Sequence, residues 1–223
     1  MRIFWNTILL TWCLSLIFLG HAARPRIKPV ISIGSEKAPL VITEFVAPTC
    51  HVCADFSQSL LPKLKQHYID KGLMRLIIVP LPYNYIDLRA ATIIFRSPNP
   101  VTTYEYVFKN QEQWAGEKNP LDALVSMLIQ KGIPKKATIR TKSSKRLENL
   151  LIKTRMDIEK KYDVDAIPVC FIGQRKIVGL VPWKELQQHI NEALVFLKKG
   201  GRIEAFGQKD EEQSKNKRKK RSA

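Results

Sequence analysis

The sequence has few cysteines and few acidic residues for its length of 223 residues. Its four cysteines are too few for a small secreted protein that depends on disulfides for its stability. It contains no internal repeat, which excludes a repeat array. Only 20 acidic residues oppose 37 basic ones, so the formal net charge is +17. Such a charge can indicate nucleic acid, an anionic membrane or acidic proteins as partners, depending on where the positive residues lie.

The chain does contain enough apolar sequence for a folded domain. It is 45% hydrophobic and 26% charged, which excludes a wholly disordered chain and a membrane protein with several spans. Its length fits one domain with a substantial core, or one domain that carries an insertion.

Residues 1–22 are predicted to be an export signal. Arg2 supplies the positive start, residues 3–19 are mostly apolar, and glycine and alanine stand at positions −3 and −1 of a cleavage site. The alternative is an uncleaved membrane anchor, because 17 apolar-biased residues are just long enough to span a bilayer. Cleavage would remove Cys13 and leave residues 23–35 as the lead-in to the folded domain.

Residues 206–223 are predicted to be a basic disordered tail. From Gln208 onward there is no large apolar residue, so the segment cannot bury enough surface to offset the entropy lost on ordering. The run Lys217–Arg221 resembles a nuclear-import or polyanion-binding segment by composition. An export signal at the other end argues against the nucleus. We therefore expect no specific nucleic-acid partner, and at most a weak contact of the tail with anionic surfaces.

Most of the remaining positive charge lies in one internal segment. Between Lys131 and Lys153 there are eight basic residues and a single acidic one, Glu148. The charge is therefore concentrated in this segment and in the tail, and it does not surround the closely spaced cysteines Cys50 and Cys53.

The hydrophobic pattern predicts an α/β fold in which helices interrupt the sheet-forming sequence. A β-branched run, LVITEFV, precedes a helix that opens at Cys50 and contains Pro62, which should kink it. Proline- and glycine-containing breaks divide the helical block at 86–161. The expected order is β-β-α-β, the helical block, then β-β-α. The strands are expected at 30–33, 40–46, 73–79, 169–172 and 176–178, and the last helix begins at Pro182.

The sequence Cys50-His51-Val52-Cys53 places a C-x-x-C motif after a strand and at the start of a helix. Unpaired N–H groups and a partial positive charge at a helix N-terminus stabilise a thiolate. The three-residue spacing brings both sulfurs onto one turn, where they can alternate between dithiol and disulfide. Cys50 would then be the exposed nucleophile, and Cys53 would resolve a mixed disulfide.

Two other interpretations of this motif are weaker. A zinc site would need two further ligands, and the rest of the chain offers no second paired motif. A purely structural disulfide is disfavoured because a three-residue loop removes little chain entropy. We therefore predict no metal and no other cofactor.

Around this motif the sequence resembles the DsbA-like branch of the thioredoxin superfamily. The resemblance rests on three segments in family order: IGSEKAPLVITEFVAPTCHVCADF (33–56), LPKLKQHYIDKGLMRLIIVPLP (61–82) and KKYDVDAIPVCFIGQRKIVG (160–179). It covers roughly residues 33–197. It implies a thioredoxin fold at 36–199 with the helical block as an insertion, and thiol–disulfide exchange with reduced or unfolded exported proteins.

The same resemblance implies roles for individual residues. Cys50 matches the attacking cysteine and Cys53 the resolving one. Ile167 and Pro168 match the loop that faces the cysteines and pairs with substrate backbone, and its X–Pro bond is expected to be cis. The alternative there is an ordinary trans proline at the start of a strand.

Glu44 matches a buried acid beneath the active site. Its pKa should rise on burial, and it would relay protons for Cys53. The alternative is an edge residue that reaches solvent.

Expectations also follow for His51, for Cys170 and for the aromatic residues of the helical block. His51 follows the first cysteine, whereas many oxidising members carry a histidine directly before the second, where Val52 stands here. His51 could still favour the Cys50 thiolate. Cys170 is expected to be a buried core residue, with a regulatory thiol as the alternative. The aromatic residues of the helical block are expected to be core; they are Tyr104, Tyr106, Phe108 and Trp114.

These features predict a periplasmic enzyme that donates the Cys50–Cys53 disulfide to folding proteins. By family resemblance, a DsbB-like membrane protein would re-oxidise it. One alternative is a disulfide isomerase or reductase in the same compartment. Another, of a different class, is a polyanion-binding module with a vestigial redox motif, whose binding would be sensitive to salt.

Overall fold

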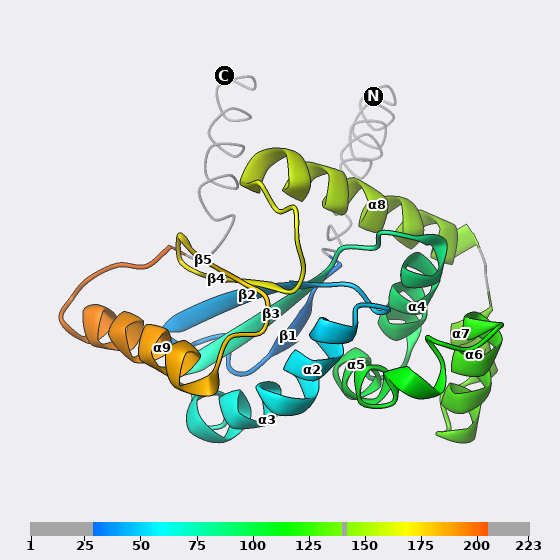
Figure 1. Cartoon of the computed structure of the whole chain (residues 1–223), viewed down its shortest axis with the longest axis horizontal. Coiled ribbons are helices and arrows are strands. Elements are labelled where there is room, and N and C mark those ends of the chain that lie inside the picture. Colours follow the sequence, from blue (N-terminus) through cyan, green and yellow to red (C-terminus); the bar gives the residue numbers. More distant parts are fainter. Residues whose placement is uncertain (1–28, 140–141, 205–223) are drawn as a thin grey trace, which may run out of the picture.

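The protein contains one five-stranded sheet with helices on both faces (Figure 1). The computed structural model describes residues 29–139 and 142–204. The predicted export signal and the predicted tail lie outside these residues. In the sheet the strands follow the order β1-β3-β2-β4-β5. Their bounds are β1 Ile31–Ile33, β2 Leu40–Val46, β3 Met74–Pro80, β4 Val169–Ile172 and β5 Arg175–Val178.

The central strand, β2, places one ionisable side chain inside the protein. β2 runs parallel to β3 and antiparallel to β4, so it is covered on both edges and both faces. Its side chains alternate: Ile42 and Val46 join the core that contains the cysteine helix, whereas Phe45 packs with the cluster on the opposite face. By this alternation Glu44 lies on the face of Ile42 and Val46, beneath the cysteine helix.

Helices cover the two faces unequally. Helices α2, α3 and α9 pack against one face of the sheet. The C-terminal part of α8 covers the other face, as seen above the sheet in Figure 1. The bounds are α2 His51–Ser59, α3 Leu61–Leu64, α8 Lys142–Tyr162 and α9 Trp183–Lys198. The single kinked helix predicted after Cys50 is instead divided at Leu60, and Pro62 lies in the first turn of α3, where its missing N–H costs nothing. A π-helical turn, η1 (Lys65–Ile69), completes this stretch.

The predicted helical block is present between β3 and β4. Its remaining elements are α4 Tyr85–Arg96, α5 Pro100–Lys109, the 3-10 turn η2 Gln111–Gln113, α6 Pro120–Gln130 and α7 Lys135–Thr138. Tyr104, Phe108 and Trp114 are buried in its core, as expected. The guanidinium of Arg89 in α4 lies 2.7 Å from the carboxylate of Glu148 in α8, both buried, and it also donates to the carbonyl of Thr138. This buried pair joins α4, α7 and α8.

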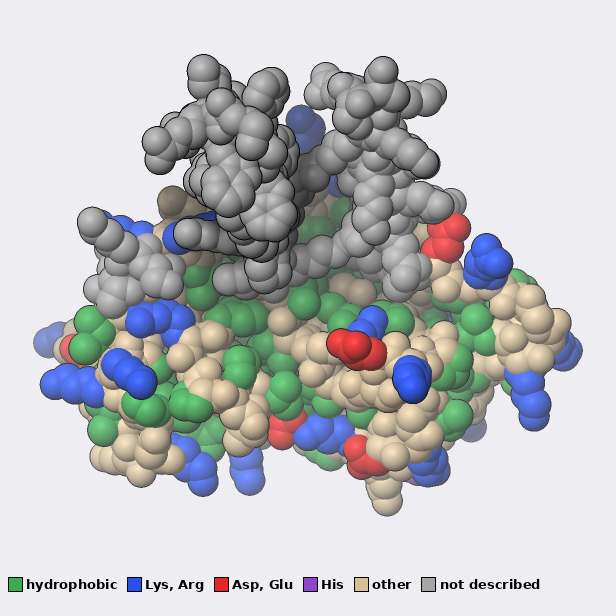
Figure 2. All heavy atoms as spheres, turned by 180° about the vertical axis from the view of Figure 1, so that it is seen from behind, with side chains coloured by type: hydrophobic (Ala, Val, Ile, Leu, Met, Phe, Trp, Pro, Cys, Tyr) green, Lys and Arg blue, Asp and Glu red, His purple; other side chains and the backbone are tan. Residues whose placement is uncertain are grey.

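Because Glu148 is buried and paired, it does not offset the positive surface of its segment. The basic side chains around it are exposed; those described are Lys131, Lys135, Lys136, Lys145, Arg146 and Lys153. Figure 2 shows that lysine and arginine side chains are scattered over the rear face, with few acidic side chains among them. In the described part of the chain, the basic residues of the 131–153 segment are thus exposed, and further lysine and arginine side chains lie on the rear face.

Helices α5 and α6 both begin with Asn-Pro but are capped differently. The Asn99 side chain accepts a 3.1 Å hydrogen bond from the N–H of Thr102, whereas Asn119 makes no such bond. We expect Asn99→Ala to lower the free energy of unfolding by about 1 kcal/mol. Asn119→Ala should lower it by only a few tenths of a kcal/mol. Urea denaturation measures both, and equal losses would contradict the assignment of the cap.

Candidate active site

The turn that connects β2 to α2 holds the predicted cysteine pair. Cys50 is the N-cap of α2, and its sulfur accepts a 3.1 Å hydrogen bond from the N–H of Cys53. A disulfide joins the two residues, which confirms that both sulfurs lie on one turn. Cys50 is half-buried, whereas Cys53 is fully buried. An incoming thiolate therefore has access to the sulfur of Cys50 and not to that of Cys53.

A loop before β4 lies against the exposed sulfur. The Ile167–Pro168 bond is cis, which confirms the prediction and excludes the trans alternative. The carbonyl oxygen of Ile167 is 3.9 Å from the sulfur of Cys50. The carbonyl of Pro168 accepts a 2.8 Å bond from the N–H of Gly179, so the loop is attached to the end of β5. A backbone carbonyl thus lies beside the reacting atom.

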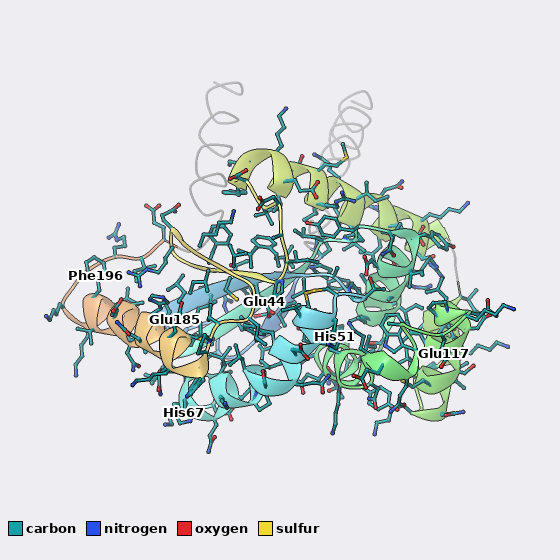
Figure 3. All side chains as sticks on the ribbon, viewed as in Figure 1. Glu44, His51, His67, Glu117, Glu185 and Phe196 are labelled. Carbon is teal, nitrogen blue, oxygen red and sulfur yellow. A yellow bond between two sulfur atoms is a disulfide. The ribbon has the colours of Figure 1, made fainter. Side chains whose placement is uncertain are left out.

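Glu44 is enclosed below this site (Figure 3). Its side chain is 0% exposed, and neither of its oxygens accepts a hydrogen bond from a described residue. Burial raises the pKa of Glu44 to about 8, so its carboxyl keeps a proton at neutral pH. The solvent-exposed alternative is wrong, because β2 is the central strand and this side chain faces the core.

Two other buried groups lie close enough to sense the charge of Glu44. Cys170 faces Glu44 across the β2–β4 ladder, and burial together with the charge of Glu44 holds its pKa well above the usual value. Burial and then Glu44 likewise raise the pKa of Tyr104. Cys170 is only 3% exposed, so it has the properties of a core residue and not of an accessible regulatory thiol.

The residues between the cysteines face solvent. The side chain of His51 is 70% exposed, and its Nε2 lies 3.7 Å from a carboxylate oxygen of Asp55, one turn along α2. Val52 is also exposed. Figure 3 shows His51 at the beginning of α2, apart from the buried Glu44. The structure thus brings His51 to Asp55, and it places the carbonyl of Ile167 beside the sulfur of Cys50.

Two side chains that the sequence did not single out reach the turn before α2. The carboxylate of Asp87 accepts 2.8 Å hydrogen bonds from both the N–H and the hydroxyl of Thr49. The amide of Gln111 donates to the carbonyls of Pro48 and Cys50, at 2.7 and 3.0 Å. Neither residue belongs to a recognisable motif, and each is separated from its partner by at least 38 residues of sequence. No local sequence signal could have indicated these contacts.

Residues 29–139 and 142–204 contain no candidate metal site and no candidate membrane span. In that part of the chain no three histidine, cysteine or acidic side chains are grouped to bind a metal ion. None of its helices combines the length and the apolar character that a membrane crossing requires.

Comparisons with known proteins agree with this geometry. The family model described as Thioredoxin matches residues 27–192. A Rickettsia felis protein named for protein-disulfide oxidoreductase activity is 25% identical over 142 residues, which cover 57% of this chain and 51% of that protein. A Bacillus cereus protein named for disulfide bond formation is 27% identical over 150 residues, which cover 64% of this chain and 69% of that protein. The chain thus spans about half the length of the first relative.

A solved structure supports the fold independently. The crystal structure of α-DsbA1 from Wolbachia pipientis superposes with a TM-score of 0.67 at 22% identity, over 76% of this chain and 92% of that one. At this level of identity the likeness establishes the fold alone. The predicted thioredoxin fold with a helical insertion is therefore confirmed.

Proposed function

The chain belongs to the thioredoxin family, and on that basis we propose that it is an exported thiol:disulfide oxidoreductase that introduces disulfides into folding proteins. One observation carries the proposal: the Cys50–Cys53 disulfide lies at a helix N-terminus with only its first sulfur accessible. The backbone of Ile167 beside that sulfur supports it further, because it offers a place for an extended substrate. The names of the Rickettsia and Bacillus relatives point to the same chemistry.

The reaction would proceed by two exchanges at sulfur. A substrate thiolate attacks the sulfur of Cys50, which forms a mixed disulfide and releases Cys53 as a thiolate. A second substrate thiolate then attacks the substrate sulfur of that mixed disulfide and releases Cys50. The substrate loses two electrons and gains a disulfide, and the Cys50–Cys53 pair gains the two electrons and becomes a dithiol. The helix N-terminus stabilises the departing Cys50 thiolate and so favours this direction.

Glu44 is proposed to exchange a proton with the sulfur of Cys53. Because burial keeps Glu44 protonated at neutral pH, it can supply a proton when Cys53 leaves as a thiolate beneath the site. The reverse transfer would activate Cys53 when the pair is re-oxidised. His51 is proposed to favour the Cys50 thiolate electrostatically when it is protonated.

The proposed setting is the periplasm, reached through the N-terminal signal. The substrates would be reduced or unfolded exported proteins, and a DsbB-like membrane partner would restore the disulfide. No cofactor is needed, because the electrons pass between sulfur atoms. The basic tail would add at most a weak attraction to anionic surfaces.

Refolding of reduced ribonuclease tests the function and its direction. Stoichiometric oxidised protein, with no other oxidant, should transfer its disulfide to ribonuclease and gain two thiols, counted by mass spectrometry. A disulfide isomerase would instead act mainly on scrambled ribonuclease and leave the reduced protein unoxidised. A vestigial module would do neither, and its binding of polyanions would survive Cys50→Ala. Either result would overturn the oxidase proposal.

A further inference from the structure

The amide of Gln111 joins the helical block to the reactive end of α2. Gln111 lies in the 3-10 turn η2 and is 4% exposed. Its Nε2 donates to the carbonyl of Pro48 at 2.7 Å and to that of Cys50 at 3.0 Å. The Cys50 carbonyl also accepts the first helical N–H of α2, from Ala54. Gln111 thus donates a hydrogen bond to both carbonyls, and Pro48 is itself buried.

The carboxylate of Asp87 accepts hydrogen bonds from Thr49, the residue between Pro48 and Cys50. It lies in the first turn of α4 and is 1% exposed. One oxygen accepts both the N–H and the hydroxyl of Thr49 at 2.8 Å, and the other accepts the N–H of Tyr83 at 3.1 Å. The Asn84 side chain caps α4 by accepting the N–H of Asp87, which fixes the position of this carboxylate.

Three consecutive residues, Pro48, Thr49 and Cys50, are therefore each bonded by the helical block. In addition, the Nε2 end of Gln111 is the positive end of its amide dipole, and it faces the turn from which the Cys50 sulfur projects. The bond to the buried Pro48 carbonyl is costly to break, because that carbonyl would lose its hydrogen bond, whereas the Cys50 carbonyl would keep the N–H of Ala54.

From this geometry we propose that Gln111, supported by Asp87, is a positioning residue that holds Cys50 in its reactive place at the N-terminus of α2. The inference rests on the function proposed above, and it makes the helical block part of the redox machinery. Gln111 acts through the turn and does not touch the substrate. Without it the turn can shift, and the sulfur loses both the alignment with the helix N-terminus and the nearby positive dipole.

The Gln111→Met variant tests this proposal, because methionine has a similar length and donates no hydrogen bond. The readout is the rate at which iodoacetamide alkylates Cys50 in the reduced protein, followed from pH 4 to 9 by peptide mass spectrometry. We expect the midpoint of this profile to rise by about half a pH unit, which is about a threefold loss of thiolate below the midpoint. The matched control is Gln113→Met, in the same turn, because the exposed side chain of Gln113 donates its hydrogen bond to Asn110 and not to the turn before α2.

A midpoint equal to that of the wild type in a folded Gln111→Met protein would overturn the proposal. If that variant does not fold, Gln111→Asn applies the same test, because its shorter amide cannot reach both carbonyls. In the wild type, the side-chain amide protons of Gln111 should exchange slowly with solvent in nuclear magnetic resonance spectra, and fast exchange would also contradict the proposal. A wild-type chain whose Cys50 never alkylates as a thiolate at low pH would instead count against the proposed oxidase.

Discussion

Alanine at Cys53 is expected to trap the protein on its substrate, whereas alanine at Cys50 is expected to abolish its reaction with substrate. Neither variant can hold the active disulfide, so both should oxidise reduced ribonuclease only at the uncatalysed rate. They differ when they meet a substrate that already contains disulfides. The accessible Cys50 of Cys53→Ala can attack such a disulfide, and no second cysteine then remains to release the protein from the mixed disulfide. Non-reducing electrophoresis should show this adduct for Cys53→Ala alone.

The third cysteine of the described chain supplies the control for this experiment. Cys170 is buried on β4 and faces the core, so Cys170→Ala should keep wild-type turnover and form no persistent adduct. Turnover by Cys50→Ala would show that another group carries the chemistry. A disulfide adduct formed by Cys50→Ala would likewise show that a group other than Cys50 reacts with the substrate.

Glu44 is expected to make the folded protein less stable as the pH rises. The pKa of Glu44 is about 8 in the folded state and near its ordinary value of 4.5 when the side chain is exposed in the unfolded chain. Below pH 4.5 both states are protonated, and the group contributes nothing. Between pH 4.5 and 8 the unfolded chain releases this proton while the folded chain retains it, so the free energy of unfolding falls. The total loss is about 4 to 5 kcal/mol by pH 8.

The Glu44→Gln variant should remove this pH dependence. An amide of the same size cannot ionise, so at pH 8 the variant should exceed the wild type in stability by about 4 kcal/mol. At pH 4.5 the two proteins should be similar. Urea denaturation of the oxidised proteins at pH 4.5, 6, 7 and 8 measures the difference. Glu112→Gln, at an exposed site, should show the same fall in the free energy of unfolding with pH as the wild type. If the stability of the wild type did not fall over this range, the raised pKa of Glu44 would be contradicted.

The fold was largely predictable because its strongest signals are local. A β-branched run ends at a C-x-x-C motif, prolines and asparagines mark helix starts, and the order of elements follows from these alternations. The break at Leu60 was not predictable from Pro62, because a proline is tolerated in the first turn of a new helix as well as at a kink. The sequence pattern alone does not distinguish the two.

The site was predictable only where its chemistry is contiguous in sequence or carried by resemblance. Cys50 and Cys53 lie three residues apart, so their disulfide could be expected from helix geometry. Resemblance also indicated Glu44 and Pro168. The contacts of Asp87 and Gln111 depend on how the helical block docks against the turn, and tertiary packing of that kind leaves no periodic trace in the sequence.

The residues of the site are far apart in the sequence and are therefore translated at different times. Cys50 precedes Gln111 by 61 residues and Ile167 by 117 residues. A chain emerges from the ribosome N-terminus first. The two reactive thiols therefore appear before the helices that hold their turn, and long before the loop that lies beside them. A growing chain thus carries both cysteines through most of its synthesis before the residues that hold and flank them have been added.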